Sequence, residues 1–262
     1  MRAWRLVVDD ERDPYWNMGA DSAILEAVIR GDSPPTLRLY GWRCPAVTIG
    51  RFQDAERGID LDFCRSHDIP IVRRPTGGRG IVHGGDLTVS LILPETELGN
   101  NGSSVAASYR ELTNGFMSAL NRLGFSSALG ACEKSAGALG DCFATRTAAD
   151  LIDTATGDKL IGSAQRRKDG VLLQQSSIRH RRPAVDPSCV FRGTVAQTGF
   201  PMESITVAEL RQAIAGAFGE TLGVELTAGM QTEGEVRDSE RIARSLEEGG
   251  LNSSSVDTGR VI

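Results

Sequence analysis

The pattern of hydrophobic and polar residues predicts helices in four segments of the chain. In residues 15–35, Ala20, Ile24, Ala27 and Val28 fall on one face, and Gly31 followed by Pro34–Pro35 ends the pattern. The other three segments are 103–123, 203–223 and 232–248. The segment 103–123 carries an apolar face of Leu112, Phe116, Ala119 and Leu120, and Gly124 ends it. Thr206 and Glu209 form a capping box in the third, and the fourth is very polar.

Alternating apolar and polar residues predict the strands. In residues 86–94, Leu87, Val89, Leu91 and Leu93 point to one face, and Thr88, Ser90 and Ile92 to the other. Residues 159–178 predict a hairpin with its turn at Asp169–Gly170. Further strands are predicted at 3–8, 36–42, 46–51 and 69–75, and a short helix near 56–66. The Gly/Ala-rich residues 130–147 predict an exposed or mobile loop.

These elements predict an α+β fold, a mixed or antiparallel sheet packed with helices. No internal repeat occurs. We predict a catalytic domain over residues 1–225 and a small C-terminal helical extension over residues 226–262. The chain of 262 residues is long enough for one large domain.

Charge and composition exclude several classes of protein. The formal net charge is −5, which argues against a general nucleic-acid binder. No apolar run suggests a signal peptide or a membrane span, so a cytoplasmic protein is expected. Five irregularly spaced cysteines argue against a disulfide framework, and three scattered histidines argue against a zinc site. We therefore expect no metal.

The segment "RRPTGGRG" is the first candidate site. Its glycines allow backbone N–H groups to approach a ligand closely, and its arginines suit a phosphate or a carboxylate. A tight turn with solvated arginines explains the same residues equally well. The residues concerned are Arg73, Arg74, Thr76, Gly77, Gly78, Arg79 and Gly80.

A reactive cysteine is the second candidate. Cys142 lies in a Gly-rich loop, where a nearby cation such as Lys159 would favour the thiolate. Cys132 lies in similar surroundings and is the rival nucleophile. The other cysteines, Cys44, Cys64 and Cys189, are expected to pack in the interior.

Other catalytic signatures are few. His83 and His180 could act as bases, whereas His67 is expected to be solvated. The chain has no G-x-S-x-G elbow, no Walker-type phosphate loop and no dinucleotide G-x-G-x-x-G motif. The basic runs 166–168 and 179–182 are either a solvated face or a docking surface for an acidic partner.

Three segments together resemble the lipoate–protein ligase and octanoyltransferase superfamily, which shares its fold with biotin protein ligases. They are "RRPTGGRGIVHGGDLTVSLILP", "DKLIGSAQRRKDGVLLQQSSI" and "WNMGADSAILEAV", in family order, and the resemblance covers roughly residues 4–225. The Cys–Phe pair in "GDCFA", ahead of "KLIGSAQ", is similar to octanoyltransferases of the LipM type.

This resemblance implies acyl transfer without ATP, metal or another cofactor. Cys142 would take an octanoyl group from octanoyl–acyl carrier protein and pass it to a lysine of a lipoyl domain. The acceptor would be a glycine cleavage H protein or a 2-oxoacid dehydrogenase E2 subunit, and the enzyme a monomer. Lys159 would favour the thiolate, and amides near Gly77, Gly78 or Gly162 would stabilise the oxyanion. Predicted substrate contacts beyond the Gly–Arg loop are His83, Gly162, Ser163, Ala164, Gln165 and Gln175, and Ile81, Leu87 and Val89 are candidates for the acyl-pocket lining.

Three alternatives stay open at this point. An ATP-dependent lipoate ligase would keep the loop and the lysine but would not need the cysteine. An amidotransferase would move the acyl group between lipoyl domains, and a non-catalytic relative would only bind them. The sequence departs from the family at "HGGD", at Gln175, where many relatives have histidine, and in its tail, which lacks an aromatic-rich ending.

Overall fold

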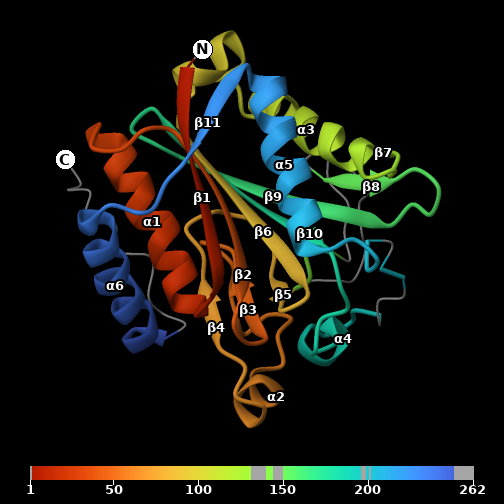
Figure 1. The fold of residues 1–262 in the computed structure, drawn as a ribbon. Coiled ribbons are helices and arrows are strands. Elements are labelled where there is room, and N and C mark those ends of the chain that lie inside the picture. Colours follow the sequence, from red (N-terminus) through yellow and green to blue (C-terminus); the bar gives the residue numbers. More distant parts are fainter. Residues whose placement is uncertain (1, 131–139, 144–149, 196–198, 201, 251–262) are drawn as a thin grey trace.

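A mixed sheet of eight strands forms the centre of the protein, seen here in a computed structural model (Figure 1). The structure describes residues 2–130, 140–143, 150–195, 199–200 and 202–250. The strand order is β11-β1-β2-β6-β10-β9-β8-β7, and a second sheet has the order β4-β3-β5. The strands are β1 (Arg2–Arg12), β2 (Thr36–Trp42), β3 (Ala46–Ile49), β4 (Ile71–Arg73), β5 (Ile81–His83), β6 (Asp86–Pro94), β7 (Ser127–Leu129), β8 (Leu151–Asp153), β9 (Lys159–Lys168), β10 (Val171–Arg179) and β11 (Val224–Ala228).

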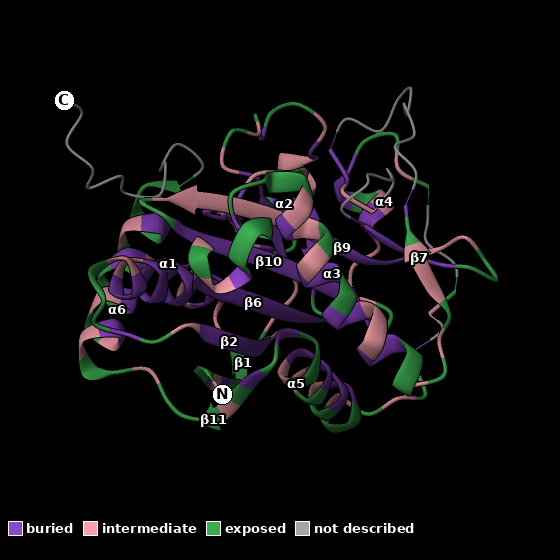
Figure 2. Ribbon diagram, turned by 90° about the horizontal axis from the view of Figure 1, so that it is seen from above, coloured by how far each residue is buried: buried purple, intermediate pink, exposed green. Residues whose placement is uncertain are grey.

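Helices cover the large sheet, which confirms the predicted α+β class. They are α1 (Pro14–Arg30), α2 (Leu61–Ser66), a 3-10 helix η1 (Glu95–Asn101), α3 (Val105–Arg122), α4 (Pro187–Val190), α5 (Val207–Leu222) and α6 (Glu233–Glu248). Viewed from above, β6 and β10 are buried between helices whose outer faces are exposed (Figure 2). Strand β1 pairs parallel with β2 and β11, and the other pairs of this sheet are antiparallel.

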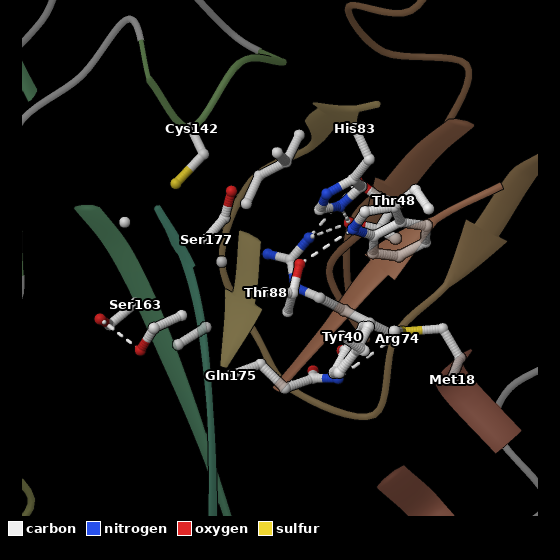
Figure 3. Close-up of a pocket in the computed structure, with 16 residues that line it drawn as sticks. Met18, Tyr40, Thr48, Arg74, His83, Thr88, Cys142, Ser163, Gln175 and Ser177 are labelled. Atoms are coloured by element: carbon white, nitrogen blue, oxygen red, sulfur yellow. Dashed lines mark hydrogen bonds between the residues drawn. The ribbon is translucent and has the colours of Figure 1, made fainter. Parts of the chain in front are cut away.

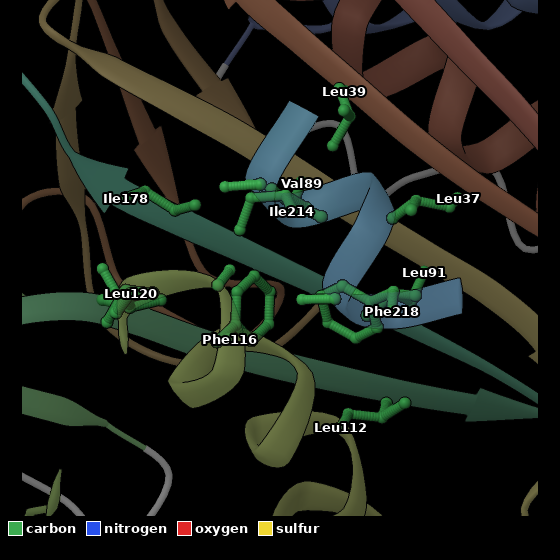
Figure 4. Close-up of a cluster of buried hydrophobic side chains, with 14 of the residues drawn as sticks. Leu37, Leu39, Val89, Leu91, Leu112, Phe116, Leu120, Ile178, Ile214 and Phe218 are labelled. Carbon is green, nitrogen blue, oxygen red and sulfur yellow. The ribbon is translucent and has the colours of Figure 1, made fainter. Parts of the chain in front are cut away.

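The alternation in β6 separates two faces as predicted. Leu87, Val89, Leu91 and Leu93 join the main hydrophobic cluster, where α3 and α5 pack through an edge-to-face pair of Phe116 and Phe218 (Figure 4). Ile92 lies on the opposite face with residues of α1. The prediction that Leu87 and Val89 line an acyl pocket is therefore wrong, because their side chains fill the core on the other side of the sheet.

Local signals set the ends of the predicted helices. Gly31 ends α1 in the left-handed conformation (φ 76°), which glycine adopts without strain. The capping box of Thr206 and Glu209 begins α5, as predicted, and Thr232 with Glu235 makes a second one at α6. In the described part of the chain, no helix is long and apolar enough to cross a membrane.

The C-terminal elements pack against the N-terminal ones. Strand β11 pairs with β1, and α6 packs along α1 at Gly19, where a Cβ would meet the Ser239 carbonyl at 2.6 Å. A buried ion pair joins Arg5 to Glu235 at 2.6 Å. The predicted division at residue 225 falls within β11, and the two-part organisation stays a prediction.

The two strands predicted within residues 36–51 are confirmed as β2 and β3, which belong to the large and the small sheet, respectively. Two other local predictions need correction. The predicted loop 130–147 lies mostly outside the described residues, but Gly140–Phe143 are buried or half-buried rather than exposed. Cys64 is buried as expected, whereas Cys189 is exposed.

Candidate active site

A cleft of about 400 Å³ lies between the two sheets (Figure 3). Strands β2, β6, β9 and β10 form one wall, and β3, β5 and the Gly–Arg loop form the other. The lining residues are Met18, Tyr40, Trp42, Thr48, Arg74, Gly78, Ile81, His83, Thr88, Cys142, Gly162, Ser163, Ala164, Gln175, Ser176 and Ser177.

Backbone pairing brings Cys142 to this cleft. The Gly80 amide donates to the Gly140 carbonyl, and the Cys142 amide donates to the Gly80 carbonyl, both at 2.8 Å. Both glycines are needed for this approach, since a Cβ on Gly80 would meet Phe191 at 2.6 Å and one on Gly140 would meet the Gly58 carbonyl at 2.8 Å. Gly80 was predicted to bind substrate, but it holds the cysteine segment and does not line the cleft.

Lys159 lies beside the cysteine, as the resemblance to the superfamily implied. Its Nζ is 3.3 Å from Cys142 Sγ and 2.8 Å from the Cys142 carbonyl oxygen. It also forms an ion pair at 3.0 Å with Asp150, and both side chains are only 2% exposed. The Lys159 ammonium thus lies between a carboxylate and the cysteine sulfur, where it is placed to pair with a thiolate. No local pattern in the sequence marks Asp150, which precedes β8 and reaches Lys159 only through the fold.

We expect Asp150→Asn to slow acylation of the enzyme by about 10- to 100-fold. The variant keeps the shape of the side chain but removes the counter-charge that holds Lys159 against Cys142. Asp150 is therefore a positioning residue. Single-turnover kinetics would check this, because a loss of positioning lowers the rate constant while the amplitude stays that of the wild type. A lowered amplitude with an unchanged rate constant would instead indicate a loss of folded protein, and Asp150→Glu should recover part of the rate.

The two consecutive arginines of the loop hold backbone rather than facing solvent. Arg73 donates from one nitrogen to the carbonyls of residues 50, 51 and 53 at 2.8–3.1 Å, and it does not line the cleft. Arg74 is buried and donates to the carbonyls of Gly77 and Arg79. Burial lowers the pKa of Arg74, and the nearby Cys142 partly offsets this. The loop is thus ordered by its own arginines, which excludes the interpretation of a turn with two solvated arginines.

A buried polar network connects the Gly–Arg loop to α1. Thr76 donates to Gln175 Oε1 at 2.7 Å, and Gln175 Nε2 donates to Asp21 at 2.7 Å. Asp21 also accepts from Arg38 at 2.7 Å and from Tyr40 at 2.8 Å. The Gln175 amide thus donates to Asp21 and accepts from Thr76 at the same time.

His83 is fixed at both ring nitrogens. Nδ1 lies 2.8 Å from Asp86 and Nε2 lies 2.8 Å from Thr48, while the ring stacks on Trp42 at 3.8 Å. Burial raises the pKa of Asp86, but His83 and hydrogen bonds to the carboxylate outweigh burial, so this pKa is lowered overall. These contacts suit a structural wall of the cleft. His180 lines a different cavity and contacts the Ile205 carbonyl through Nε2.

The cleft brings together eight of the predicted site residues, and seven lie elsewhere. The eight are Arg74, Gly78, His83, Cys142, Gly162, Ser163, Ala164 and Gln175. Those outside the lining are Arg73, Thr76, Gly77, Arg79, Gly80, Lys159 and Gln165. Lys159 nevertheless touches Cys142, and Gln165 bonds to Gln174 and Ser108. The rival nucleophile, Cys132, lies outside the described residues.

Sequence reasoning missed the aromatic end of the cleft and one tyrosine close to the cysteine. Tyr40 and Trp42 follow the apolar alternation of β2 on the face opposite Leu37 and Leu39, so that pattern could have indicated them. Tyr109 of α3 offers no such signal. Burial raises the pKa of Tyr109 to about 12, with further contributions from nearby Asp150 and Cys142. Tyr109 therefore stays protonated and is not a general base at neutral pH.

Comparisons with known proteins agree with this geometry. A family described as "Lipoyl protein ligase A/B catalytic domain" matches residues 13–180. The chain belongs to the lipoyl protein ligase A/B family. Within it, the chain is 36% identical to Octanoyltransferase LipM of Symbiobacterium thermophilum, covering 92% of this chain and 94% of the relative. It is 30% identical to Octanoyltransferase LipM of Staphylococcus aureus, covering 91% and 94%. Because this family likeness extends over nearly the whole length of these relatives, the chain is an octanoyltransferase, which confirms the predicted activity.

Solved structures confirm the fold predicted from the resemblance. A bipartite archaeal lipoate protein ligase from Thermoplasma acidophilum superposes with a TM-score of 0.78 at 21% identity and covers the whole of both chains. A lipoate-protein ligase A bound with ATP gives a TM-score of 0.76 at 23% identity, covering 93% of this chain and 95% of that chain. At these identities the likeness establishes the lipoate–protein ligase fold.

Proposed function

We propose that the protein transfers an octanoyl group from octanoyl–acyl carrier protein, through a thioester on Cys142, to a lysine of a lipoyl domain. The observation that carries the proposal is the contact between Cys142 Sγ and Lys159 Nζ at 3.3 Å, at the edge of a largely apolar cleft. An ATP-dependent ligase has no use for a nucleophilic cysteine at this place. The cysteine–lysine pair therefore favours the transferase over the ligase.

In the first half-reaction, the Cys142 thiolate attacks the carbonyl carbon of the donor thioester. A new carbon–Sγ bond forms, the bond to the donor sulfur breaks, and the leaving thiolate takes a proton from the Lys159 ammonium. Of the three glycines predicted to stabilise the oxyanion, Gly78 and Gly162 line the cleft and Gly77 does not. Removing a single oxyanion donor typically costs about 10²- to 10³-fold in rate.

In the second half-reaction, the neutral amine of the acceptor lysine attacks the same carbonyl carbon. An amide forms, Cys142 leaves as thiolate, and the surplus proton of the attacking nitrogen passes to the neutral amine of Lys159. This restores the thiolate–ammonium pair with which the cycle began. One lysine 3.3 Å from the sulfur thus supplies a proton in one step and accepts one in the next.

The acyl chain would lie in the cleft, toward its buried end. That end is formed by Met18, Tyr40 and Trp42, while Ile81 lines the side wall. Each buried methylene contributes about 0.8 kcal/mol of binding free energy. This apolar lining supports a medium-length acyl chain as the group that is transferred.

The lipoyl-domain acceptor is proposed to be a glycine cleavage H protein or a 2-oxoacid dehydrogenase E2 subunit. One structural neighbour, an archaeal lipoate protein ligase, is described together with its E2 lipoyl domain, which supports an acceptor of this kind. We also propose a monomeric, cytoplasmic enzyme. The four cysteines in the described part of the chain are free, which is consistent with a reducing compartment.

The test is to incubate the enzyme with octanoyl–acyl carrier protein in the absence of ATP and to measure its intact mass. We expect the gain of one octanoyl group, which hydroxylamine removes because it cleaves thioesters. Adding an apo lipoyl domain should then discharge the enzyme and octanoylate the domain. If only ATP with free octanoate or lipoate supports modification of the domain, the transferase mechanism is wrong and the protein is a ligase. If only an octanoylated lipoyl domain charges the enzyme, it is an amidotransferase.

A further inference from the structure

A second cavity lies on the other side of the catalytic cysteine. Its volume is about 340 Å³, and we call it the arginine cavity. Asp141 and Phe143, the two neighbours of Cys142 in the chain, line it, together with Arg179, Arg181 and Phe200. Ser177 lines both the arginine cavity and the cleft. The two cavities therefore adjoin at Ser177 and at the segment of residues 141–143 that contains Cys142.

A thioester donor needs two such spaces. When Cys142 Sγ attacks the carbonyl carbon, the acyl chain lies on one side of the reacting carbon and the thiol portion of the donor on the other. The acyl chain fits the cleft, whose inner end is apolar and closed by buried side chains. The thiol portion must reach from the reacting sulfur to the protein surface. The arginine cavity offers this path, because it extends to the exposed residue Arg181.

The inner part of the arginine cavity combines aromatic walls with a hydrogen-bond donor. Arg179 is 9% exposed, and its guanidinium carbon lies 5.0 Å from the Phe200 ring centre and 5.7 Å from that of Phe143. It donates to the carbonyls of Lys159 and Gly199. Its Nε is buried and has no hydrogen-bond partner among the described residues. A buried donor without a partner costs free energy unless a ligand satisfies it.

The outer part of the cavity is cationic. Arg181 lines it and Arg182 lies over the Phe200 ring at 5.4 Å, and both arginines are exposed. The cavity also contains two carboxylates, which lie in its inner part. Asp86 accepts from Ser177 and contacts His83, and Asp141 accepts from the Phe143 amide. The loop arginines Arg73 and Arg74 already donate hydrogen bonds to backbone carbonyls, so they are poorly suited to bind an external phosphate.

We propose that the arginine cavity binds the thiol portion of the donor, a phosphorylated pantetheine-type arm. The amide-containing chain would lie against Phe143, Phe200 and the Arg179 Nε, and the phosphate would lie between Arg181 and Arg182. This deepens the proposed function, since it rests on a thioester donor for Cys142. Guanidinium groups suit a phosphate, and a peptide-like amide suits a buried N–H donor between aromatic rings.

Two small donors that differ only in the phosphate test this site directly. They are octanoyl-pantetheine and its 4′-phosphate, and the measured quantity is the rate constant for acylation of Cys142 at subsaturating donor. We expect wild-type enzyme to react about 10- to 100-fold faster with the phosphorylated donor, the size expected for charge-assisted hydrogen bonds. Arg181→Ala should remove most of this preference, so that the ratio of the two rate constants falls toward one. The matched control, Arg237→Ala, removes an exposed arginine of α6 and should keep the preference.

Each other outcome overturns the proposal. A wild-type enzyme without preference for the phosphate, or a preference that persists in Arg181→Ala and in an Arg181→Ala/Arg182→Ala double variant, would exclude a phosphate site here. The same holds if neither small donor reacts while octanoyl–acyl carrier protein does, because the arm then contributes no useful binding. A parallel reaction with octanoyl–acyl carrier protein distinguishes failure of the phosphate site from failure of the proposed function. If this donor does not acylate the wild type, the proposed donor is wrong. Equal melting temperatures would show that the variants are folded.

Discussion

Cys142→Ala is expected to abolish the acyl-enzyme and to reduce octanoyl transfer by at least about 10⁴-fold, since removing a covalent nucleophile leaves only binding and electrostatic stabilisation. Among the residues that the structure describes, Cys142 is the cysteine that lines the cleft. Its sulfur lies 3.3 Å from the Lys159 ammonium. The side chain is half-buried, so alanine should leave folding intact. Intact-mass spectrometry after mixing with octanoyl–acyl carrier protein measures the adduct, and a discontinuous assay of lipoyl-domain octanoylation measures transfer.

Two further cysteine variants make the result specific. Cys132→Ala replaces the rival nucleophile from the sequence, and Cys189→Ala replaces an exposed cysteine outside the cleft lining. Both should form the adduct at the wild-type rate. If the adduct survives in Cys142→Ala and disappears in Cys132→Ala, Cys132 is the nucleophile and the assignment of Cys142 is wrong.

Lys159→Met should lower the acylation rate by about 10²- to 10⁴-fold, which is the usual contribution of a positioned proton donor and acceptor. Methionine keeps most of the length and the apolar stem of lysine but has neither charge nor proton. Stability should fall as well, by about 3–5 kcal/mol, because Asp150 keeps its charge at a site where its side chain is 2% exposed and loses its lysine partner. Rapid-quench measurement of the acyl-enzyme and chemical denaturation give the two quantities.

A double variant separates the catalytic effect from the effect on stability. Lys159→Met/Asp150→Asn removes both charges of the buried pair and should recover much of the lost free energy of unfolding, since neither charge of the pair then remains at the buried site. Its acylation rate should stay as low as that of Lys159→Met. If the double variant recovers activity together with stability, Lys159 serves the fold and takes no part in proton transfer.

Several features of the molecule could be predicted from the sequence because they depend on local chemistry. The period of apolar residues gave the long helices and the two faces of β6, and Gly31 and the Thr206–Glu209 pair marked where helices end or begin. The resemblance of "RRPTGGRG" and "KLIGSAQ" to one superfamily gave the fold and the activity. It also implied the pair of Cys142 and Lys159, which the fold brings within 3.3 Å.

Tertiary structure alone decided which of these residues face the substrate. Arg73 and Gly80 belong to the motif, yet one holds carbonyls of the 50–53 turn and the other pairs with the cysteine segment. A motif records that a residue is required, but it does not distinguish contact with substrate from support of the backbone. The roles of Asp150 and Arg179 depend on the fold even more than those of Arg73 and Gly80. Their roles arise from neighbours distant in sequence or from burial, and burial of charge has no local signature in the chain.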